Sequence, residues 1–213
     1  MIKKFAEQPF GEFVEDLNSD LSAPGGGTAA GFCGAMASAL AGMVAHMTVD
    51  KPRFADVKAD MEEVLEKSAA FQKEMLLMAQ QDAEVFGQVL NTYKLPKSTP
   101  EEEQKRNEAI EKATKLSILA SLHMAEVCVQ ILLLAQTVVK KGSRMLVTDG
   151  AASALLARAG LRIAAYNVQI NQDFVKDRSF NTKVGADLNK HVHHGAILES
   201  AIIREVESRI LKN

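Results

Sequence analysis

Apolar residues recur every three or four positions along almost all of the 213 residues, and this spacing is typical of helices rather than strands. Together with the breaks at glycine and proline, it predicts six helices, at about residues 9–21, 26–49, 53–91, 100–140, 148–172 and 183–211. No linker, repeat or low-complexity tract interrupts the pattern. We therefore expect residues 1–213 to form one all-α domain, a bundle of about six mostly long helices. Helices this long, with apolar residues on more than one face, also favour a homodimer.

The fourth predicted helix carries the clearest terminal signals. Thr99 can cap its start, Pro100 suits its first position, and three glutamates follow at the positive end of the helix dipole. At the other end, Gly142 directly follows Lys141 and is typical of a C-terminal cap.

The second predicted helix is unusual because residues 21–49 contain no charged side chain. Its small residues form one stripe at spacings of three and four: Gly27, Gly31, Gly34, Ser38, Ala41 and Ala45. Such a stripe lets a neighbouring backbone come unusually close. The segment is long enough to cross a membrane, but it is poor in the large aliphatic residues that usually face lipid. We therefore expect it at the centre of the bundle rather than in a membrane.

This helix begins in the glycine turn of residues 24–28, Pro-Gly-Gly-Gly-Thr. Consecutive glycines permit positive φ angles and the close approach of a ligand, and the first N–H groups of a helix attract an anion or a polarised carbonyl. Two nucleotide motifs fit poorly. The dinucleotide pattern requires a strand before its glycines, whereas helical spacing precedes these. A P-loop would need Lys and Ser or Thr where Phe32 and Cys33 stand.

Composition narrows the range of partners and compartments. Charged residues make up 24% of the chain and the net charge is −2, which is ordinary for a globular protein and disfavours nucleic acid as a partner. Cys33 and Cys128 lie in apolar helical contexts, which favours free thiols in a reducing compartment, although the sequence also permits a disulfide. The N-terminus has no apolar segment of signal-peptide length. We expect a cytoplasmic protein without a membrane partner.

Three polar side chains share a helix face with apolar or small residues. Asp82 is either a solvated helix aspartate or a carboxylate turned into a pocket, where it can act as a base or pair with a cationic group. Asn167 and Asn171 stand four residues apart and therefore share one helix face. Because asparagine is a mediocre helix former, the pair either bridges helices or recognises a ligand.

The histidines give a weaker signal. His46 ends the uncharged helix and His123 lies in an apolar one, and each is either a core residue or a proton carrier. His191, His193 and His194 cluster in the sequence, but no neighbouring Cys or Asp completes a ligand set. We therefore expect no metal site.

Short segments with these candidate residues occur in a characteristic order. They are Pro24-Gly25-Gly26-Gly27-Thr28-Ala29-Ala30, Met43-Val44-Ala45-x-Met47-Thr48, Asp82-Ala83-x-x-Phe86, Leu95-Pro96-Lys97, Arg106 with Ala109-Ile110, Asp149-x-Ala151-Ala152, and Asn167-Val168-x-Ile170-Asn171-x-x-Phe174-Val175-Lys176-Asp177. Together they resemble the cyclodeaminase/cyclohydrolase family of folate one-carbon enzymes. This family includes the deaminase half of formiminotransferase-cyclodeaminase and stand-alone bacterial methenyltetrahydrofolate cyclohydrolases.

The resemblance implies an all-helical homodimer whose folate site is built around the glycine turn and nearby helix ends. The implied substrate is a one-carbon derivative of tetrahydrofolate. Either 5,10-methenyltetrahydrofolate is interconverted with 10-formyltetrahydrofolate, or it is formed from 5-formiminotetrahydrofolate with release of ammonia. No cofactor beyond the tetrahydrofolate carrier is expected. A noncatalytic folate-binding or helical interaction protein on the same scaffold is the alternative.

This hypothesis gives each candidate residue a role. Asp82 is the acid/base or charge-stabilising carboxylate, with His46 as a reserve proton carrier. Asn167 and Asn171 would hold the pterin or the reacting amide. The other expected substrate-binding residues are Gly25, Gly26, Gly27 and Thr28 as hydrogen-bond donors, and Lys97, Arg106 and Arg178 as partners of the glutamate tail.

Overall fold

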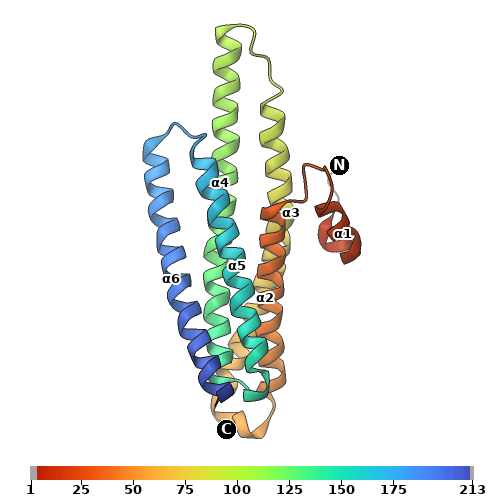
Figure 1. Cartoon of the computed structure of the whole chain (residues 1–213), viewed down its shortest axis with the longest axis vertical. Helices are drawn as coiled ribbons and strands as arrows, with labels where there is room; N and C mark the ends of the chain where they lie inside the picture. Colours follow the sequence, from red (N-terminus) through yellow and green to blue (C-terminus); the bar gives the residue numbers. More distant parts are fainter. Residues whose placement is uncertain (1–3, 212–213) are drawn as a thin grey trace.

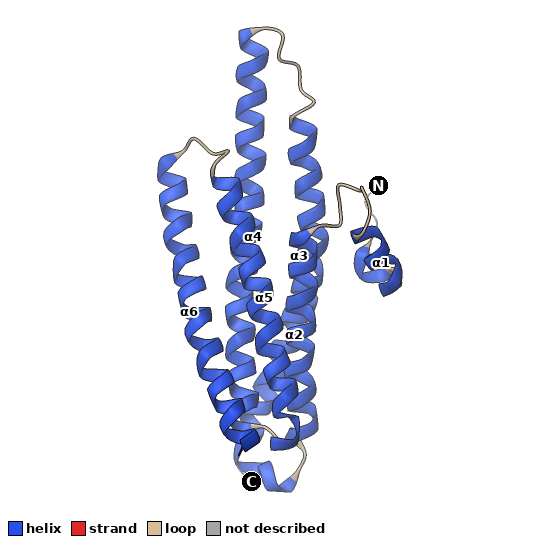
Figure 2. Ribbon diagram, viewed as in Figure 1, coloured by secondary structure: helices blue, strands red, loops and turns tan. Residues whose placement is uncertain are grey.

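Six α-helices build the computed structural model, which describes residues 4–211 (Figures 1 and 2). They are α1 (Phe10–Leu17), α2 (Gly26–Val49), α3 (Lys58–Thr92), α4 (Pro100–Lys141), α5 (Val147–Gln172) and α6 (Arg178–Leu211). Short 3-10 turns form at Phe5–Glu7, Pro52–Val57 and Arg144–Leu146, and no strand occurs in the described range. The predicted all-α class and the number of helices are confirmed.

Three helix boundaries differ from the prediction. The third helix begins at Lys58 rather than near residue 53, because Pro52–Val57 forms a 3-10 turn. The other two boundaries differ because side chains cap the backbone. The first helix ends at Leu17, and Ser19 then donates a hydrogen bond to the carbonyl of Asp16. The last helix begins at Arg178 rather than near residue 183, because the carboxylate of Asp177 accepts the N–H of Phe180 at 3.0 Å. Asp177 thus acts as the N-cap of α6.

The predicted ends of α4 are confirmed. The Thr99 hydroxyl accepts the N–H of Glu102 at 3.2 Å, and the Glu102 carboxylate accepts the N–H of Thr99 at 3.3 Å. This reciprocal pair is a capping box and satisfies two N–H groups that the helix leaves open. At the other end Gly142 is the C-cap, and its N–H bonds the carbonyl of Val138.

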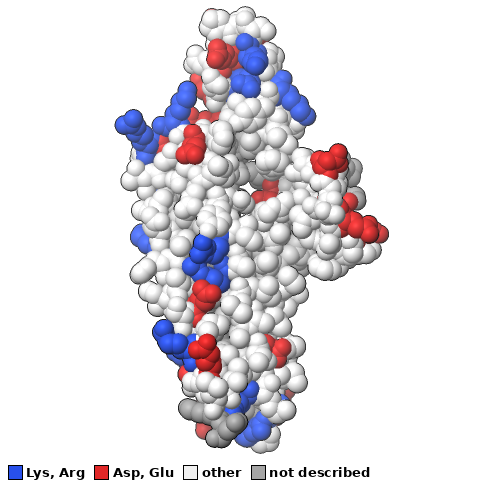
Figure 3. Space-filling model, viewed as in Figure 1, with Lys and Arg blue, Asp and Glu red and all other residues white. Residues whose placement is uncertain are grey.

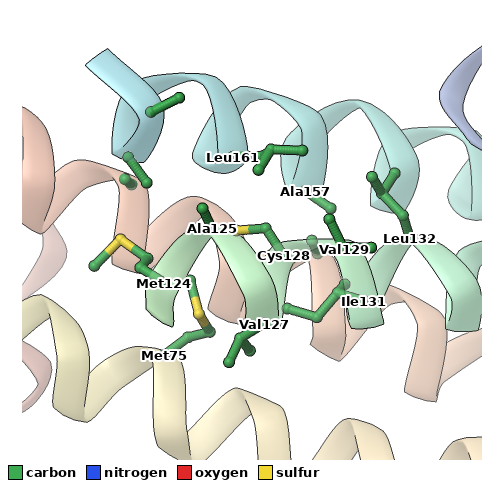
Figure 4. Packing of buried hydrophobic residues seen from close by; sticks show 14 of the residues in the cluster. Met75, Met124, Ala125, Val127, Cys128, Val129, Ile131, Leu132, Ala157 and Leu161 are labelled. Carbon is green, nitrogen blue, oxygen red and sulfur yellow. The ribbon is translucent and has the colours of Figure 1, made fainter. Parts of the chain in front are cut away.

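The helices α2 to α6 run along one long axis, and α1 lies beside the bundle (Figure 1). The α3–α4 hairpin extends beyond the ends of the other helices. Buried side chains of α4 pack against α5 and α3 in the largest core cluster (Figure 4). Its fully buried members include Met75, Ile131, Leu132 and Leu161. This packing leaves one end of α2 beside the upper parts of α3, α4 and α5.

The stripe of small residues on α2 faces α3, as its spacing predicts. A Cβ atom on Gly31 would lie 2.6–2.9 Å from the Cβ, Cα and N atoms of Ala79. A Cβ atom on Gly34 would lie 2.1 Å from Cε of Met75. Further along, Ser38 donates a hydrogen bond to the carbonyl of Ser68 at 2.9 Å. Backbone contact this close fixes the height of α3 against α2 and therefore the position of every side chain that α3 carries.

Two helices are long and apolar enough to cross a membrane by length and composition alone. These are α2 and α4, with mean hydropathies of 1.5 and 2.0 over an 18-residue window. In each window 61% of the residues are buried inside the bundle. Because α2 packs against α3, α4 and α5, the prediction that it lies at the centre of the bundle is confirmed.

Candidate functional site

A cavity of about 240 Å³ lies where α2 begins, and helices α2, α3, α4 and α5 all contribute to its wall. Figure 3 shows a hollow in this face beside the upper part of the bundle, with acidic atoms visible in it. The lining residues are Ser22, Ala23, Gly25, Gly26, Gly27, Asp82, Ala83, Phe86, Ser117, Asn167, Ile170 and Asn171. The structure therefore brings together three groups that the sequence places far apart: the glycine turn, Asp82 and the asparagine pair.

The glycine turn allows the Asp82 carboxylate to lie directly against the start of α2. A Cβ atom on Gly27 would lie 2.0 Å from Oδ1 and 2.6 Å from Oδ2 of Asp82. The turn does not use the positive φ angles that consecutive glycines permit, because no glycine within residues 4–211 has one. Gly27 is required for close approach instead, and the group that approaches it is the Asp82 side chain of α3.

Burial and hydrogen bonding act on Asp82 in opposite directions. Burial raises the pKa of this carboxyl above its ordinary value because the charged form loses water. The hydroxyl and backbone N–H of Thr28 donate to the carboxylate and lower the pKa, but burial has the larger effect. A carboxyl with a raised pKa at the wall of a cavity is a candidate for proton transfer.

The opposite wall carries neutral amides. Asn167 and Asn171 both line the cavity from α5, and the side-chain N–H of Asn171 donates to the hydroxyl of Ser117 at 3.4 Å. Sequence analysis missed Ser117. It belongs to a stripe of small hydroxyl residues on α4, with Thr114 and Ser121 at spacings of three and four, and both of these are buried. That spacing is the signal that identifies it.

Three basic candidates lie outside the cavity wall. Lys97 is exposed in the loop between α3 and α4, beyond the end of the other helices. Arg106 donates to the carbonyl of Tyr93 at 3.4 Å and its guanidinium lies 5.4 Å from that ring, so it joins the ends of α3 and α4. Arg178 is exposed at the first position of α6. None of these three side chains contacts the carboxylate of Asp82.

Two further candidates also differ in position from what the sequence predicted. Thr28 is fully buried and does not line the cavity, because its hydroxyl turns to Asp82 at 3.3 Å. His46 is exposed near the other end of α2, beside a separate groove. Twenty residues of helix separate it from Gly26, which is roughly 30 Å. Within one subunit the structure therefore does not bring His46 to the Asp82 cavity.

No group of three or more His, Cys, Asp or Glu side chains within residues 4–211 is arranged to hold a metal ion. Cys33 and Cys128 are free thiols in the structure, and burial raises the pKa of Cys128 to about 12. The cavity chemistry of the described residues is thus that of one carboxylate, neutral amides, a hydroxyl and backbone N–H groups.

Comparison with known proteins gives consistent matches. Residues 9–190 match the model of the formiminotransferase-cyclodeaminase family. The chain is 35% identical to methenyltetrahydrofolate cyclohydrolase of Methylorubrum extorquens over 93% of its own length and 95% of that protein. It is 26% identical to formimidoyltransferase-cyclodeaminase of Rattus norvegicus, but it spans only 36% of that longer protein.

The fold comparison agrees with the sequence comparisons. The crystal structure of formiminotetrahydrofolate cyclodeaminase from Thermotoga maritima superimposes with a TM-score of 0.87 at 24% identity, covering 96% of this chain and 98% of that one. This likeness establishes the shared helical architecture. The chain thus belongs to the formiminotransferase-cyclodeaminase family and is a cyclohydrolase- or cyclodeaminase-type enzyme of folate one-carbon metabolism.

Proposed function

We propose that the protein is a methenyltetrahydrofolate cyclohydrolase whose reaction takes place at the Asp82 cavity. One observation carries the proposal: among residues 4–211, Asp82 is the single ionisable side chain that lines the cavity, and the other polar side chains there are Ser22, Ser117 and two asparagines. A negative carboxylate beside neutral amides suits a cationic substrate. The methenyl group of 5,10-methenyltetrahydrofolate is such a cation, with its positive charge shared between N5 and N10.

The reaction needs one proton acceptor that later returns a proton. Asp82 takes a proton from water as the water oxygen bonds to the methenyl carbon, which gives a neutral tetrahedral carbon between N5 and N10. The bond from this carbon to N5 then breaks, N5 receives a proton from Asp82, and the hydroxyl proton leaves as the formyl C=O forms. The products are 10-formyltetrahydrofolate and one proton. Asn167 and Asn171 would orient the pterin ring.

The cavity volume limits how much of the substrate it can enclose. Pockets that hold a whole drug-sized ligand measure about 300–1,000 Å³, and this cavity measures about 240 Å³. We infer that it takes the pterin end of the substrate. The glutamate tail would then extend along the α3–α4 hairpin, where Lys97 and Arg106 lie about ten residues of helix further on, roughly 15 Å.

One feature favours the hydrolase over the deaminase. The cyclohydrolase relative is more similar and is matched along nearly its whole length, whereas the rat formimidoyltransferase-cyclodeaminase is matched over little more than a third. We propose that tetrahydrofolate carries the one-carbon group and that the reaction needs no further cofactor. We also propose that it takes place in the cytoplasm.

A spectrophotometric assay tests this proposal. Purified protein should accelerate the loss of methenyl absorbance from 5,10-methenyltetrahydrofolate well above the rate in buffer, with kcat in the usual range of about 1–1,000 s⁻¹. A parallel reaction should contain 5-formiminotetrahydrofolate. Appearance of methenyl absorbance there, with release of ammonia, would instead identify a cyclodeaminase. Binding of tetrahydrofolate without turnover of either substrate would identify the noncatalytic alternative.

We also propose that two copies associate through the outer faces of α2 and α5. Six large uncharged side chains on these adjacent helices are 37–59% exposed: Met36, Met43, Met47, Leu155, Tyr166 and Ile170. Residues of this size have on the order of 200 Å² of surface each, so they leave roughly 600 Å² of apolar surface exposed. Figure 3 shows few charged atoms around α2 on this face. The area approaches the ~800 Å² per partner of a stable interface.

A charge introduced on this face should separate the subunits. We expect wild-type protein to sediment as a dimer at micromolar concentration and Met43→Glu to sediment as a monomer, because the carboxylate would be buried without a partner. Leu77→Glu is the matched control, since Leu77 is 63% exposed on α3 outside this face. A wild-type monomer, or a Met43→Glu dimer as tight as wild type, would contradict the proposed interface.

A further inference from the structure

Thr28 is placed so that both of its hydrogen-bond donors act on one carboxylate. It occupies the third position of α2 and none of its surface is exposed. Its hydroxyl donates to Oδ2 of Asp82 at 3.3 Å, and its backbone N–H also donates to that carboxylate. Asp82 reaches this position only because Gly27 has no side chain.

The hydroxyl of Thr28 has no acceptor within its own helix. Buried helical threonines commonly bond the carbonyl four residues earlier, and for Thr28 that residue is Pro24, which precedes α2. Thr48 does so near the other end of α2, where its hydroxyl donates to the Val44 carbonyl at 2.7 Å and its surface is equally buried. The Thr28 hydroxyl instead crosses to α3. The contact therefore serves the carboxylate and not the helix.

We propose that Thr28 is a positioning residue for Asp82. The hydroxyl and backbone N–H of Thr28 hold one side of the carboxylate, so that the remaining lone pairs of the carboxylate are available to the cavity. This inference rests on the proposed function, in which Asp82 transfers the proton. It also replaces the role that the sequence predicted for Thr28, because a residue with no exposed surface and no place in the cavity wall does not contact the substrate.

The electrostatic consequence has a definite sign. Donors to a carboxylate favour its ionised form, and burial opposes them at Asp82. Loss of the hydroxyl therefore raises the pKa of Asp82 further, and the base form is then populated only at higher pH. We expect the acidic limb of the pH profile of kcat/KM to move upward by about one pH unit.

The surroundings of Asp82 make this readout specific. The described lining residues from the loop before α2, from α2 and from α3 are Ser22, Ala23, three glycines, Ala83 and Phe86, and those from α4 and α5 are Ser117, Asn167, Ile170 and Asn171. None of these side chains titrates between pH 3 and pH 9. No charged neighbour contributes to the pKa shift of Asp82, which has burial and Thr28 as its causes. A shift of the acidic limb thus reports on this contact.

The test compares Thr28→Val, Thr28→Ser and Thr48→Val. Valine keeps the shape and backbone N–H of threonine but removes the hydroxyl, whereas serine keeps the hydroxyl. We expect Thr28→Val to move the acidic limb upward by about one unit and to lower kcat/KM about tenfold at pH values below the limb. Thr28→Ser should restore the wild-type limb. Thr48→Val loses a buried hydroxyl of the same helix and should leave the limb unchanged.

A second readout is independent of turnover. Carbon-13 NMR of protein labelled at aspartate carboxyls, with the Asp82 signal assigned by its loss in Asp82→Asn, gives the titration of this group directly. An upward shift in Thr28→Val supports the proposal even if neither folate substrate is turned over, which would contradict only the proposed function. A wild-type Asp82 titration in Thr28→Val overturns it. If Thr28→Val does not fold, the smaller Thr28→Ala carries the same comparison.

Discussion

Asp82→Asn is expected to lower kcat by about 10²–10⁴, the usual contribution of a positioned acid or base. Asparagine has nearly the same shape as aspartate and still offers an oxygen to Thr28, but it neither accepts a proton from water nor balances the charge of a methenyl cation. Steady-state kinetics with 5,10-methenyltetrahydrofolate gives the measurement. Asp187→Asn is the matched control, because Asp187 is on α6 and pairs with Lys190 at 3.0 Å, and it should keep wild-type turnover.

The Asp82→Asn variant should be at least as stable as the wild-type protein. Burial raises the pKa of Asp82, so at pH values between the ordinary aspartate pKa and the raised one the native state holds a proton that the unfolded chain has released. The free energy of unfolding therefore falls as the pH rises from the ordinary aspartate pKa through the raised one, and it remains reduced above that. Asparagine has no charge to bury. At pH 7 we therefore expect Asp82→Asn to melt at the wild-type temperature or above. This stability also makes the kinetic test clear: a folded Asp82→Asn protein with wild-type kcat would show that Asp82 takes no part in the mechanism.

Gly31→Ala is expected to destabilise the protein by about 1–3 kcal/mol, which is the usual cost of overpacking a core. The added Cβ would meet the backbone and Cβ of Ala79 at 2.6–2.9 Å, so α3 must move away from α2. This cost exceeds the helix-propensity gain of alanine over glycine. A chain of this length loses about 2–4 °C per kcal/mol, so we expect the melting temperature to fall by about 2–12 °C.

Gly26→Ala is the control for Gly31→Ala, because it also replaces a glycine of α2 by alanine but adds a Cβ atom that meets no close neighbour. A Cβ atom on Gly26 meets Cγ2 of Ile163 at 3.8 Å, an ordinary contact, so this variant should melt within about 2 °C of wild type. If Gly31→Ala also melts within that interval, α2 and α3 are not held together as closely as the structure indicates.

Hydrophobic spacing predicted the helices well because each helix carries its own signal. The uncharged run and small-residue stripe of α2 and the Thr99–Pro100 start of α4 are local patterns with local causes. The boundaries missed at Leu17 and Arg178 depend on single side-chain caps, and these compete with spacing that continues past them.

The site was less predictable because it depends on which helix ends meet. Unusual polar residues on apolar helices identified Asp82 and the asparagine pair, and the structure places them on one cavity. Residue type alone did not reveal that Thr28 bonds Asp82 with its hydroxyl and does not itself line the cavity. It also could not place His46, because the length of α2 carries that residue roughly 30 Å from the glycine turn.

The contact between Asp82 and the first turn of α2 couples the protonation state of this carboxyl to the dipole of that helix. The first N–H groups of α2 have no acceptor within the helix, and an ionised Asp82 supplies the negative charge beside them. When Asp82 takes up a proton, that charge disappears just as a water oxygen bonds to the substrate carbon. The new hydroxyl on that carbon is neutral, so the start of α2 would face a charged partner only in the part of each catalytic cycle in which Asp82 is ionised.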